Sequence, residues 1–541
     1  MDIKKPVRGS SPVPDHIMQS FPGDPKHEIA VTWRTSTDVS EGYLTFQAVW
    51  GGPVRKVKAV SRIFKSDIDE SYIHTAIAND LTPGTKYTYS VGTDEYNKGE
   101  YTFETEPEHC ERFRFLVVAD QQNDTPTCRP DYEPFRRAVQ LALKRHPGCR
   151  FIFTIGDNVG DGQNEHQWNG YFHGLQGIAE NIPLMMTTGN HDNRGWKTYD
   201  PGNRTGKFYL QHADFFDTQF ALAYPRNGFE GYETENYSFD YGNVHFTVLG
   251  INEFEKVAQW AKDDLAASDK RWKIASFHFP LFAVQPEAVT GLYQGRIDLA
   301  VEEGGADLCF AGHEHSLART FPMKNFEMFD KPSEGVVHYI MGNTGENVYC
   351  SNARKIWHPY FYPQEEKNCQ YSIVDVTPDT LTITAYLDDG RLIDRLVIDK
   401  KNDRIDPPAP APIYHKTKMA FKGELLEMPT RGTYAHNKEG QWFVPFGQVA
   451  LGLGALSEKK PGQVKIGMYG KEATFTEGSD VAETPDGPLT LSAPVYRGDR
   501  GHLYMPLDDI MQFFDMQYVY AARNNILVFD YKDDWPVVPQ P

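Results

Sequence analysis

The first part of the chain is marked by short runs in which apolar and polar residues alternate. Residues 29–35 and 85–92 are two such runs, and Pro83-Gly84 forms a turn signal before the second. Alternation with a period of two, bounded by proline and glycine, predicts strands that bury one face. We therefore expect a β-sandwich over residues 26–107, whose polar residues form no catalytic pattern.

The middle of the chain, residues 110–400, combines fully apolar runs of strand length with segments of helical spacing. The apolar runs lie at residues 115–119, 151–155, 244–249 and 273–277. Helical spacing recurs at residues 134–145 and 254–267. Strands that alternate with helices predict a layered α/β domain, in which ligands bind at the carboxyl ends of the strands.

The last part follows a proline-rich stretch at residues 406–412, which lies in a linker that we place at 401–415. A stiff, extended connector of this kind predicts few contacts across the boundary. From 416 to 535 one pattern occurs twice, at 442–446 and at 503–507: a strand centred on proline, then a short helix and a closing strand. The repetition predicts a small α+β module with an internal repeat.

The composition is typical of a folded, multidomain protein. The chain has 541 residues, of which 40% are hydrophobic and 13% aromatic, which is enough for several packed cores. Its 55 basic and 74 acidic residues give a formal charge of −19, which argues against a nucleic-acid partner. The six cysteines include no CxxC pair, so no structural zinc motif is present, while their even number permits disulfides.

The cellular location is left open by the sequence. The chain has no run of about 18 apolar residues, so we expect no transmembrane segment. Residues 1–6 lack the apolar core of a signal peptide. The protein is therefore either cytoplasmic or the mature form of a chain whose leader has been removed.

Five short polar motifs follow the apolar runs of the middle region in order. They are Asp120-Gln121-Gln122, Gly156-Asp157-Asn158, Gly189-Asn190-His191-Asp192, the single His278, and Gly312-His313-Glu314-His315. Carboxylate, carboxamide and imidazole groups together are suitable ligands for first-row metal ions. Two such ions that share a bridging carboxylate bind a phosphoryl group and activate a water molecule. Each motif alone is weak evidence, but their order and their position after strands predict a metal centre.

This ordered set of motifs resembles that of the calcineurin-like metallophosphoesterases, and Arg319-Thr320 extends the match to the purple acid phosphatase branch. Members of that branch place a fibronectin type III-like domain before the catalytic domain, and residues 81–89 resemble the start of a strand in such domains. The resemblance covers residues 26–400 and implies that residues 110–400 form an α/β/β/α four-layer catalytic domain. It implies hydrolysis of phosphate esters, in the first place phosphomonoesters, by a hydroxide bound at a dinuclear metal site.

The ligand scheme of the family can be carried over residue by residue. The resemblance implies that one ion is held by Asp120, Asp157 and His315, and the other by Asp157, Asn190, His278 and His313, so that Asp157 is the bridge. It implies that His191 stabilises the phosphoryl transition state or protonates the leaving group. The expected cofactors are two divalent or trivalent ions of iron, manganese or zinc, and the expected partner is a small phosphorylated substrate.

Two positions depart from the family pattern. Gln122 stands where many phosphoesterases have histidine, and Gly160 stands where the purple enzymes have an iron-binding tyrosine. Glutamine can bind a metal through its carbonyl oxygen, so Gln122 stays a candidate ligand. Glu165 and His166 are expected to be surface residues, and Arg194 is a candidate contact for phosphate.

The repeated C-terminal module resembles the copper amine oxidase N-terminal-like, or stalk, domain of bacterial surface and secreted proteins. This implies association with the cell wall but no copper site, because the module has no cluster of ligands. Since both flanking modules resemble extracytoplasmic ones, we expect a secreted or cell-surface hydrolase. Two alternatives to a phosphomonoesterase stay open: a phosphodiesterase with the same metal core, and an envelope-binding protein with a weakly catalytic metal site.

Overall fold

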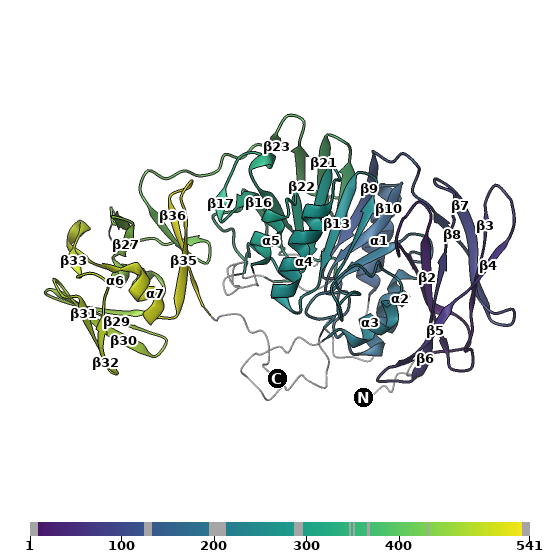
Figure 1. The fold of residues 1–541 in the computed structure, drawn as a ribbon, viewed down its shortest axis with the longest axis horizontal. Helices are drawn as coiled ribbons and strands as arrows, with labels where there is room; N and C mark the ends of the chain where they lie inside the picture. Colours follow the sequence, from purple (N-terminus) through teal and green to yellow (C-terminus); the bar gives the residue numbers. More distant parts are fainter. Residues whose placement is uncertain are drawn as a thin grey trace.

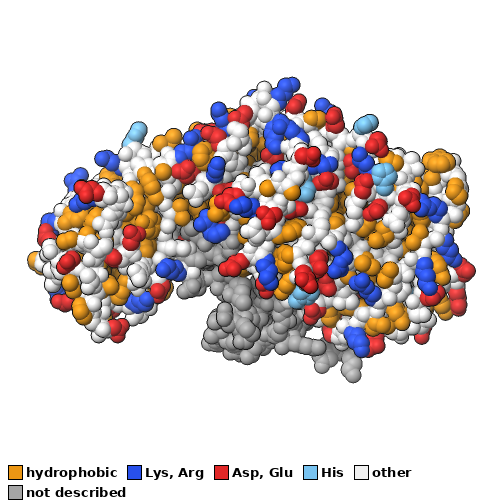
Figure 2. Space-filling model, in the orientation of Figure 1, with side chains coloured by type: hydrophobic (Ala, Val, Ile, Leu, Met, Phe, Trp, Pro, Cys, Tyr) orange, Lys and Arg blue, Asp and Glu red, His pale blue; other side chains and the backbone are white. Residues whose placement is uncertain are grey.

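The computed structural model describes residues 9–123, 132–193, 212–285, 296–345, 348–349, 352–364, 368–428, 430 and 432–532. Three parts follow one another along the longest axis: an N-terminal sandwich, a central layered domain and a C-terminal module (Figure 1). Acidic, basic and apolar side chains are interspersed over the face seen in Figure 2. No helix in the described part of the chain is long and apolar enough to cross a membrane.

The N-terminal part is a sandwich of two four-stranded antiparallel sheets. One sheet has the order β1 (Asp15–Ser20), β2 (Ile29–Ser36), β6 (Glu70–Ala78), β5 (Val60–Lys65), and the other has the order β4 (Arg55–Lys58), β3 (Tyr43–Ala48), β7 (Lys86–Gly92), β8 (Asn97–Glu104). Trp33, Phe46 and Tyr89 are buried in their common core. The sandwich begins ahead of residue 26, because β1 pairs with β2.

The central domain contains two sheets that pack face to face. The first has the order β11 (Leu184–Thr187), β10 (Cys149–Ile155), β9 (Phe113–Val118), β20 (Gln370–Val376), β21 (Thr380–Leu387), β22 (Leu392–Asp399), β23 (Arg404–Asp406). The second has the order β12 (Tyr237–Tyr241), β13 (Val244–Leu249), β14 (Trp272–Phe277), β15 (Leu308–Ala311), β18 (Val336–Ile340), β16 (Leu317–Lys324), β17 (Glu327–Met328), with β19 (Tyr360–Tyr362) paired to β16. Phe151 and Phe246 meet edge to face between the sheets, with 5.5 Å between ring centres.

Helices cover the outer faces of both sheets, which gives four layers in the order α/β/β/α (Figure 1). The helices are α1 (Glu133–Arg145), α2 (Glu165–Leu175) and α3 (Asp214–Phe220) beside the first sheet, and α4 (Phe254–Ala267) and α5 (Ile297–Glu303) beside the second. In α4 the buried residues Val257, Ala261 and Leu265 recur every four positions, so they lie on the one side that faces the sheet. The helical spacing predicted for α1 and α4 is confirmed.

Two strand–helix units form the centre of the C-terminal module. β27 (Gln441–Val444) leads into α6 (Phe446–Gly452), and β34 (Leu503–Pro506) leads into α7 (Leu507–Phe513). β27 and β34 pair antiparallel, with Phe443 opposite Pro506 and Val444 opposite Met505. The other described strands of the module are β24 (Lys418–Phe421), β25 (Glu424–Leu425), β26 (His436–Lys438), β28 (Leu456–Lys460), β29 (Gln463–Met468), β30 (Lys471–Thr476), β31 (Val481–Thr484), β32 (Gly487–Thr490), β33 (Tyr496–Arg497), β35 (Met516–Ala521) and β36 (Ile526–Tyr531).

The boundary between the central domain and the C-terminal module is closely packed, so the expectation of few contacts across it is wrong. β23 lies inside the predicted linker and yet extends the first sheet by pairing with β22. Ala411 and Ile526 share an apolar core with Trp357 of the central domain. The amide of Met328 donates to Asn524 Oδ1 at 2.8 Å. Residues 407–410 themselves are mostly exposed, so the contacts across the boundary come from Ala411 and from the module that follows.

The sandwich is joined to the central domain by a buried ion cluster. Arg34 of β2 is 1% exposed, and its Nε donates to Asp15 Oδ1 at 2.9 Å. Its Nη1 pairs with Glu165 at the start of α2. Glu165 is therefore buried rather than on the surface as expected, because the N–H groups of a buried guanidinium need acceptors, and burial raises the pKa of Glu165 to about 8. His166 is half-buried.

Candidate metal centre

The polar motifs meet at one edge of the central domain. The parallel strands β9, β10 and β11 lead into the loops that hold Asp120, Asp157 and Asn190. The parallel strands β14 and β15 of the second sheet lead to His278 and to the loop 312–315. The carboxyl ends of strands in both sheets thus bring together side chains that are up to about two hundred residues apart.

Four of the expected ligands have a left-handed backbone. The φ angle is 52° at Asp120, 50° at Asp157, 72° at His313 and 50° at His315. Such a conformation costs a residue with a side chain on the order of 1–3 kcal/mol, and it persists only where the surrounding contacts fix the loop. Positive φ at four of the seven expected ligands indicates that contacts from neighbouring loops hold these ligand loops in shape.

Two glycines of the motifs permit the close approach of the loops. Gly156 has a φ of 86°, and a Cβ atom there would lie 2.4 Å from His278 Nδ1. A Cβ atom at Gly189 would lie 2.3 Å from Asp157 Oδ1. Any side chain at either position would displace one of the candidate ligands.

Asp157, His278, His313 and Asn190 form one cluster of donor atoms. One donor atom from each of the first three lies within 4.8 Å of the others, and His278 Nε2 is 3.3 Å from Asp157 Oδ2. Asn190 Oδ1 is 3.2 Å from His278 Nε2 and 2.9 Å from His313 Nδ1. His278 Nδ1 is 2.8 Å from the carbonyl of Ile155, and donation there leaves the lone pair of Nε2 directed at the cluster.

Asp120, Gln122 and His315 form a second group of donors that is also adjacent to Asp157. His315 Nε2 is 3.6 Å from Asp120 Oδ1. Asp120 Oδ2 is buried, and within the described ranges it has no hydrogen-bond partner. An unpartnered carboxylate oxygen is costly to bury, and a bound cation would remove that cost. The donor set on both sides of Asp157 therefore fits two metal ions.

The amide of Gln122 has a preferred orientation in this pocket. With its oxygen and nitrogen exchanged, Nε2 donates to the carbonyls of Asp120 at 3.1 Å and Asp157 at 3.3 Å. Oε1 then lies 3.3 Å from His315 Nε2, at the position that faces the Asp157 carboxylate. Since amide orientations are assigned from the hydrogen-bond network, this arrangement is the better one. It directs the oxygen of Gln122 toward the site.

The electrostatics of the cluster follow from its burial. Burial raises the pKa of Asp120 well above its usual range, and repulsion from Asp157 adds to this. Burial acts in the same direction on Asp157, but His278 and His191 outweigh it and hold the pKa of Asp157 below its usual value. Burial opposes the charge of His278, yet Asp157 raises the pKa of that imidazole to about 9. Burial and His278 lower the pKa of His313 to about 3.

His191 is oriented by the loops on either side of it. Its backbone N–H donates to Asp157 Oδ1 at 2.8 Å, and its Nδ1 is 2.9 Å from the carbonyl of Gly160. Its Nε2 lies 3.8 Å from Asp157 Oδ2. The imidazole is thus held with Nε2 toward the candidate metal centre.

The absence of a tyrosine at position 160 has a steric explanation. A Cβ atom at Gly160 would lie 2.5 Å from the carbonyl oxygen of Asn123. The N–H of Gly160 donates to Gln167, whose own amide donates to that same carbonyl at 3.0 Å. The backbone of Asn123 therefore occupies the space that a side chain at position 160 needs.

Asp192 has a structural role in the Gly-Asn-His-Asp motif. Its Oδ2 accepts from the backbone N–H of Gly189 at 2.8 Å and from that of Asn158 at 3.2 Å. These bonds tie the loop of Asn190 to the loop of Asp157. Asp192 therefore fixes the relative position of two ligand loops without being a ligand itself.

Two residues that the motifs do not include lie beside His315. Asn343, just after β18, has its Nδ2 3.3 Å from His315 Nδ1. The ring of Tyr349 stacks on the imidazole with 4.1 Å between ring centres. The position of Asn343 after a buried strand is the sequence signal that identifies it, whereas Tyr349 has no such signal.

Glu314 lies between two candidate ligands but binds away from them. Its carboxylate accepts from the backbone N–H groups of Val284 at 2.6 Å and Gln285 at 3.3 Å. It therefore anchors the loop that follows His278. Arg194, the candidate phosphate contact, lies outside the described residues.

Two face-to-face sheets with carboxylate, amide and imidazole donors at their shared carboxyl edge define a metallophosphoesterase domain. Two family models match this chain: the purple acid phosphatase N-terminal domain at residues 14–105 and the calcineurin-like phosphoesterase domain at residues 113–317. Together they cover more than half of the chain. The chain belongs to the calcineurin-like phosphoesterases, in the purple acid phosphatase branch.

Individual relatives are distant. The chain is 24% identical over 379 residues to a protein of Arabidopsis thaliana named probable inactive purple acid phosphatase 27, a match that covers 59% of each chain. It is 24% identical over 375 residues to human acid phosphatase type 7, covering 63% of this chain and 80% of the relative. The purple acid phosphatase PPD1 of yellow lupin has a similar fold, with a TM-score of 0.59, 20% identity, and coverage of 72% of this chain and 75% of that one. The chain thus spans about three fifths of the first relative's length.

Proposed function

We propose that this protein is a metal-dependent hydrolase of phosphate monoesters with a dinuclear centre. The observation that carries the proposal is the position of Asp157 between two donor groups. Its Oδ2 is 3.3 Å from His278 Nε2 and, in the preferred orientation of Gln122, 3.3 Å from the oxygen of that side chain. One carboxylate between two groups of ligands is what a pair of ions with a shared bridge requires.

The ligands divide between the two ions. One ion would be held by Asp120, Asp157 and His315 with Gln122, and the other by Asp157, Asn190, His278 and His313. The mixture of oxygen and imidazole donors favours iron, manganese or zinc. When bound, the two ions would supply a Lewis acid for the phosphoryl oxygens and an activated water molecule.

His191 would act on the leaving group. Its Nδ1 is held by the carbonyl of Gly160, so Nε2 is the atom that faces a substrate in the site. As an imidazolium group it would donate from Nε2 to the ester oxygen as the bond to phosphorus breaks. Burial of this ring, which is 7% exposed, excludes water from that hydrogen bond.

The substrate class is tested with two small esters. 4-Nitrophenyl phosphate and bis(4-nitrophenyl) phosphate present the same leaving group as a monoester and a diester. We expect faster hydrolysis of the monoester, loss of turnover with a chelator, and recovery on addition of Mn²⁺, Fe²⁺ or Zn²⁺. A preference for the diester would identify a phosphodiesterase. A metal-loaded protein that hydrolyses neither ester would identify a binding protein.

We infer that the enzyme works outside the cytoplasm, as a secreted or surface-attached protein. The resemblance of the C-terminal module to stalk domains supports this location and a contact with the cell wall. Fractionation of producing cells tests it: the protein is expected in the medium or the wall fraction, and recovery from the cytoplasm alone would contradict the inference.

A further inference from the structure

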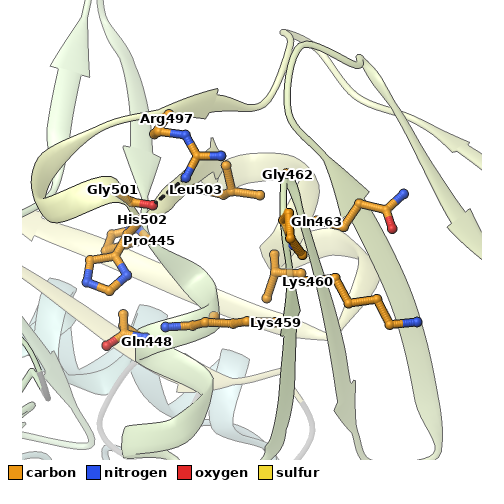
Figure 3. Close-up of a pocket in the computed structure, with 13 residues that line it drawn as sticks. Pro445, Gln448, Lys459, Lys460, Gly462, Gln463, Arg497, Gly501, His502 and Leu503 are labelled. Atoms are coloured by element: carbon orange, nitrogen blue, oxygen red, sulfur yellow. Dashed lines mark hydrogen bonds between the residues drawn. The ribbon is translucent and has the colours of Figure 1, made fainter.

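The C-terminal module contains a pocket far from the metal centre in the sequence. Its walls are the start of α6, the tip of the β28–β29 hairpin, and the segment from β33 to β34 (Figure 3). The pocket has a volume of about 170 Å³, and a single water molecule needs roughly 10–15 Å³. It therefore has room for a small organic or inorganic ligand. Because it lies between the two strand–helix units, both halves of the module contribute to it.

The lining of this pocket is basic in a protein that is acidic overall. Lys459, Lys460, Arg497 and His502 line it, and none of the described lining residues is Asp or Glu. The formal charge of the whole chain is −19. Arg497 is paired with Glu477, so the basic groups of this lining that no ion pair among the described residues neutralises are Lys459 and Lys460. Such basic groups in an acidic chain favour an anionic ligand.

Lys459 and His502 converge inside the pocket. Figure 3 shows the side chain of Lys459 crossing the pocket toward Gln448 and His502, while Lys460 extends away from them. His502 Nε2 is buried and has no hydrogen-bond partner among the residues that the structure describes. Lys459 lowers the pKa of His502, in addition to the effect of burial, which is consistent with their proximity. A charged group and a buried nitrogen thus face the same space, and no ion pair of Lys459 is found among the described residues.

The geometry of the donors indicates the shape of the anion. The forked guanidinium group of Arg497 is already used, since Nε donates to Glu477 Oε1 at 3.1 Å and Nη1 to the carbonyl of Gly501 at 3.0 Å. The planar, two-pronged contact that suits a carboxylate is therefore occupied. Three other side chains remain: the ammonium group of Lys459, the imidazole of His502 and the side-chain amide of Gln448. Each presents one nitrogen to the pocket, and the three approach from different directions. Such donors suit a tetrahedral oxyanion.

We propose that this pocket binds a phosphate group, either as inorganic phosphate or as part of a small phosphorylated molecule. The site is separate from the metal centre and does not depend on the function proposed for it. If the occupant is inorganic phosphate, the C-terminal module binds the product that a phosphatase releases. If the occupant is a phosphorylated molecule, the module holds such a compound on the enzyme.

The test uses the full-length, metal-loaded protein with methyl-labelled valine and leucine. Val464 and Leu503 line the pocket and report on it, while Val159 reports on the metal centre. The titrants are inorganic phosphate, 3,4-dihydroxybutyl phosphonate as a non-hydrolysable phosphorylated analogue, and acetate. We expect saturable shifts of the Val464 and Leu503 signals with the first two and none with acetate. Whichever of inorganic phosphate and the phosphonate has the lower Kd shows whether the pocket binds free phosphate or a phosphorylated molecule.

Two variants distinguish binding at a specific site from a general effect of charge. Lys459→Gln is expected to raise the Kd read from Val464 and Leu503 at least about tenfold, and to leave the Val159 response unchanged. Lys416→Gln, an equal change of charge at an exposed position of the same module, is expected to leave the Kd unchanged. Equal effects of the two variants, equal shifts with acetate, or no response at Val464 and Leu503 would overturn the proposal.

Discussion

At the scale of single residues, the site is shaped by backbone strain and by one replaced ligand. Asp120 and Asp157 both have positive φ angles, and each is fixed by bonds from neighbouring loops. The family resemblance predicts imidazole at the position of Gln122, and the amide nitrogen of Gln122 donates to two backbone carbonyls. Only one atom of the Gln122 side chain, its oxygen, is then left for a metal. This half of the site has a weaker donor than the half around His278.

The first prediction concerns Gln122. A neutral amide oxygen is a poorer ligand than imidazole for late first-row ions, so the ion beside Asp120 should be the more weakly held of the two. We expect fewer than two metals per chain in purified protein, activity that rises with added Mn²⁺, and occupancy that falls in Gln122→Ala. Metal analysis by mass spectrometry measures each of these. Unchanged occupancy and rate in Gln122→Ala would show that Gln122 is not a ligand.

The second prediction concerns colour. The family resemblance predicts an iron-binding tyrosine at the position of Gly160, but the backbone of Asn123 leaves no room for a side chain there. The iron-loaded protein is therefore expected to lack the visible charge-transfer band of an iron tyrosinate. Gly160→Tyr should destabilise the fold and should not produce this band. A visible band in the unaltered protein that disappears in Tyr349→Phe would show that this other tyrosine binds the iron.

The candidate ligands could be predicted from the sequence, but the backbone conformation of the loops that hold them could not. The order of the motifs identified Asp157 and His278 as candidates because both lie within two residues of the end of an apolar run. The contact between Gly160 and Asn123, and the stacking of Tyr349 on His315, depend on how loops from different strands fold over one another. No local pattern in the sequence encodes such a contact.

At the scale of secondary structure, polar contacts on the outer face of the second sheet fix α4 to it. His245 of β13 lies between Asp240 Oδ1 at 2.8 Å and Asp264 Oδ2 at 2.9 Å, and Asp264 belongs to α4. The hydroxyl of Thr247 also donates to Asp264 at 2.7 Å. The helix is thus held by its apolar face and by this ion cluster. The amphipathic spacing predicted the apolar face, whereas the cluster requires the strand register.

The third prediction concerns the pH dependence of stability. Burial opposes the charge of His245, but its hydrogen bonds to Asp240 and Asp264 raise its pKa to about 9. Because the folded pKa lies above the unfolded value of about 6.5, this contribution is complete below pH about 6.5 and is lost as the pH rises to about 9. It is on the order of 1–3 kcal/mol. Thermal unfolding of the wild type and His245→Gln should differ most at pH 6 and converge by pH 10. A constant difference would contradict this account.

At the scale of the whole molecule, three parts are joined through buried contacts. Arg34 and Glu165 join the sandwich to the central domain, and the apolar core that includes Ile526 and Trp357 joins the C-terminal module to it. The three parts themselves could be predicted from changes of pattern along the chain. Their association could not, because a proline-rich connector gives no indication of whether the surfaces on either side of it are apolar.

The fourth prediction concerns removal of the C-terminal module. A chain that ends at residue 406 retains β23 but exposes Trp357, which is 1% exposed in the full chain, together with its apolar neighbours. We expect this chain to aggregate or to unfold at least about 5 °C lower than the full chain. Calorimetry and light scattering measure both effects. A truncated chain that is monomeric with an unchanged Tm would show that the packed boundary contributes nothing to stability.

The central claim, that Asp157 bridges two catalytic ions, is tested most directly by counting metals in Asp157→Asn and measuring its kcat on 4-nitrophenyl phosphate. Asp161→Asn is the matched control, because Asp161 is a buried carboxylate on the same loop whose Oδ1 caps the turn at Gln163. The account predicts that Asp157→Asn loses metal from both positions and at least about 10³-fold in kcat, about 4 kcal/mol, while Asp161→Asn keeps its metals. Full metal content with undiminished turnover in Asp157→Asn would contradict it.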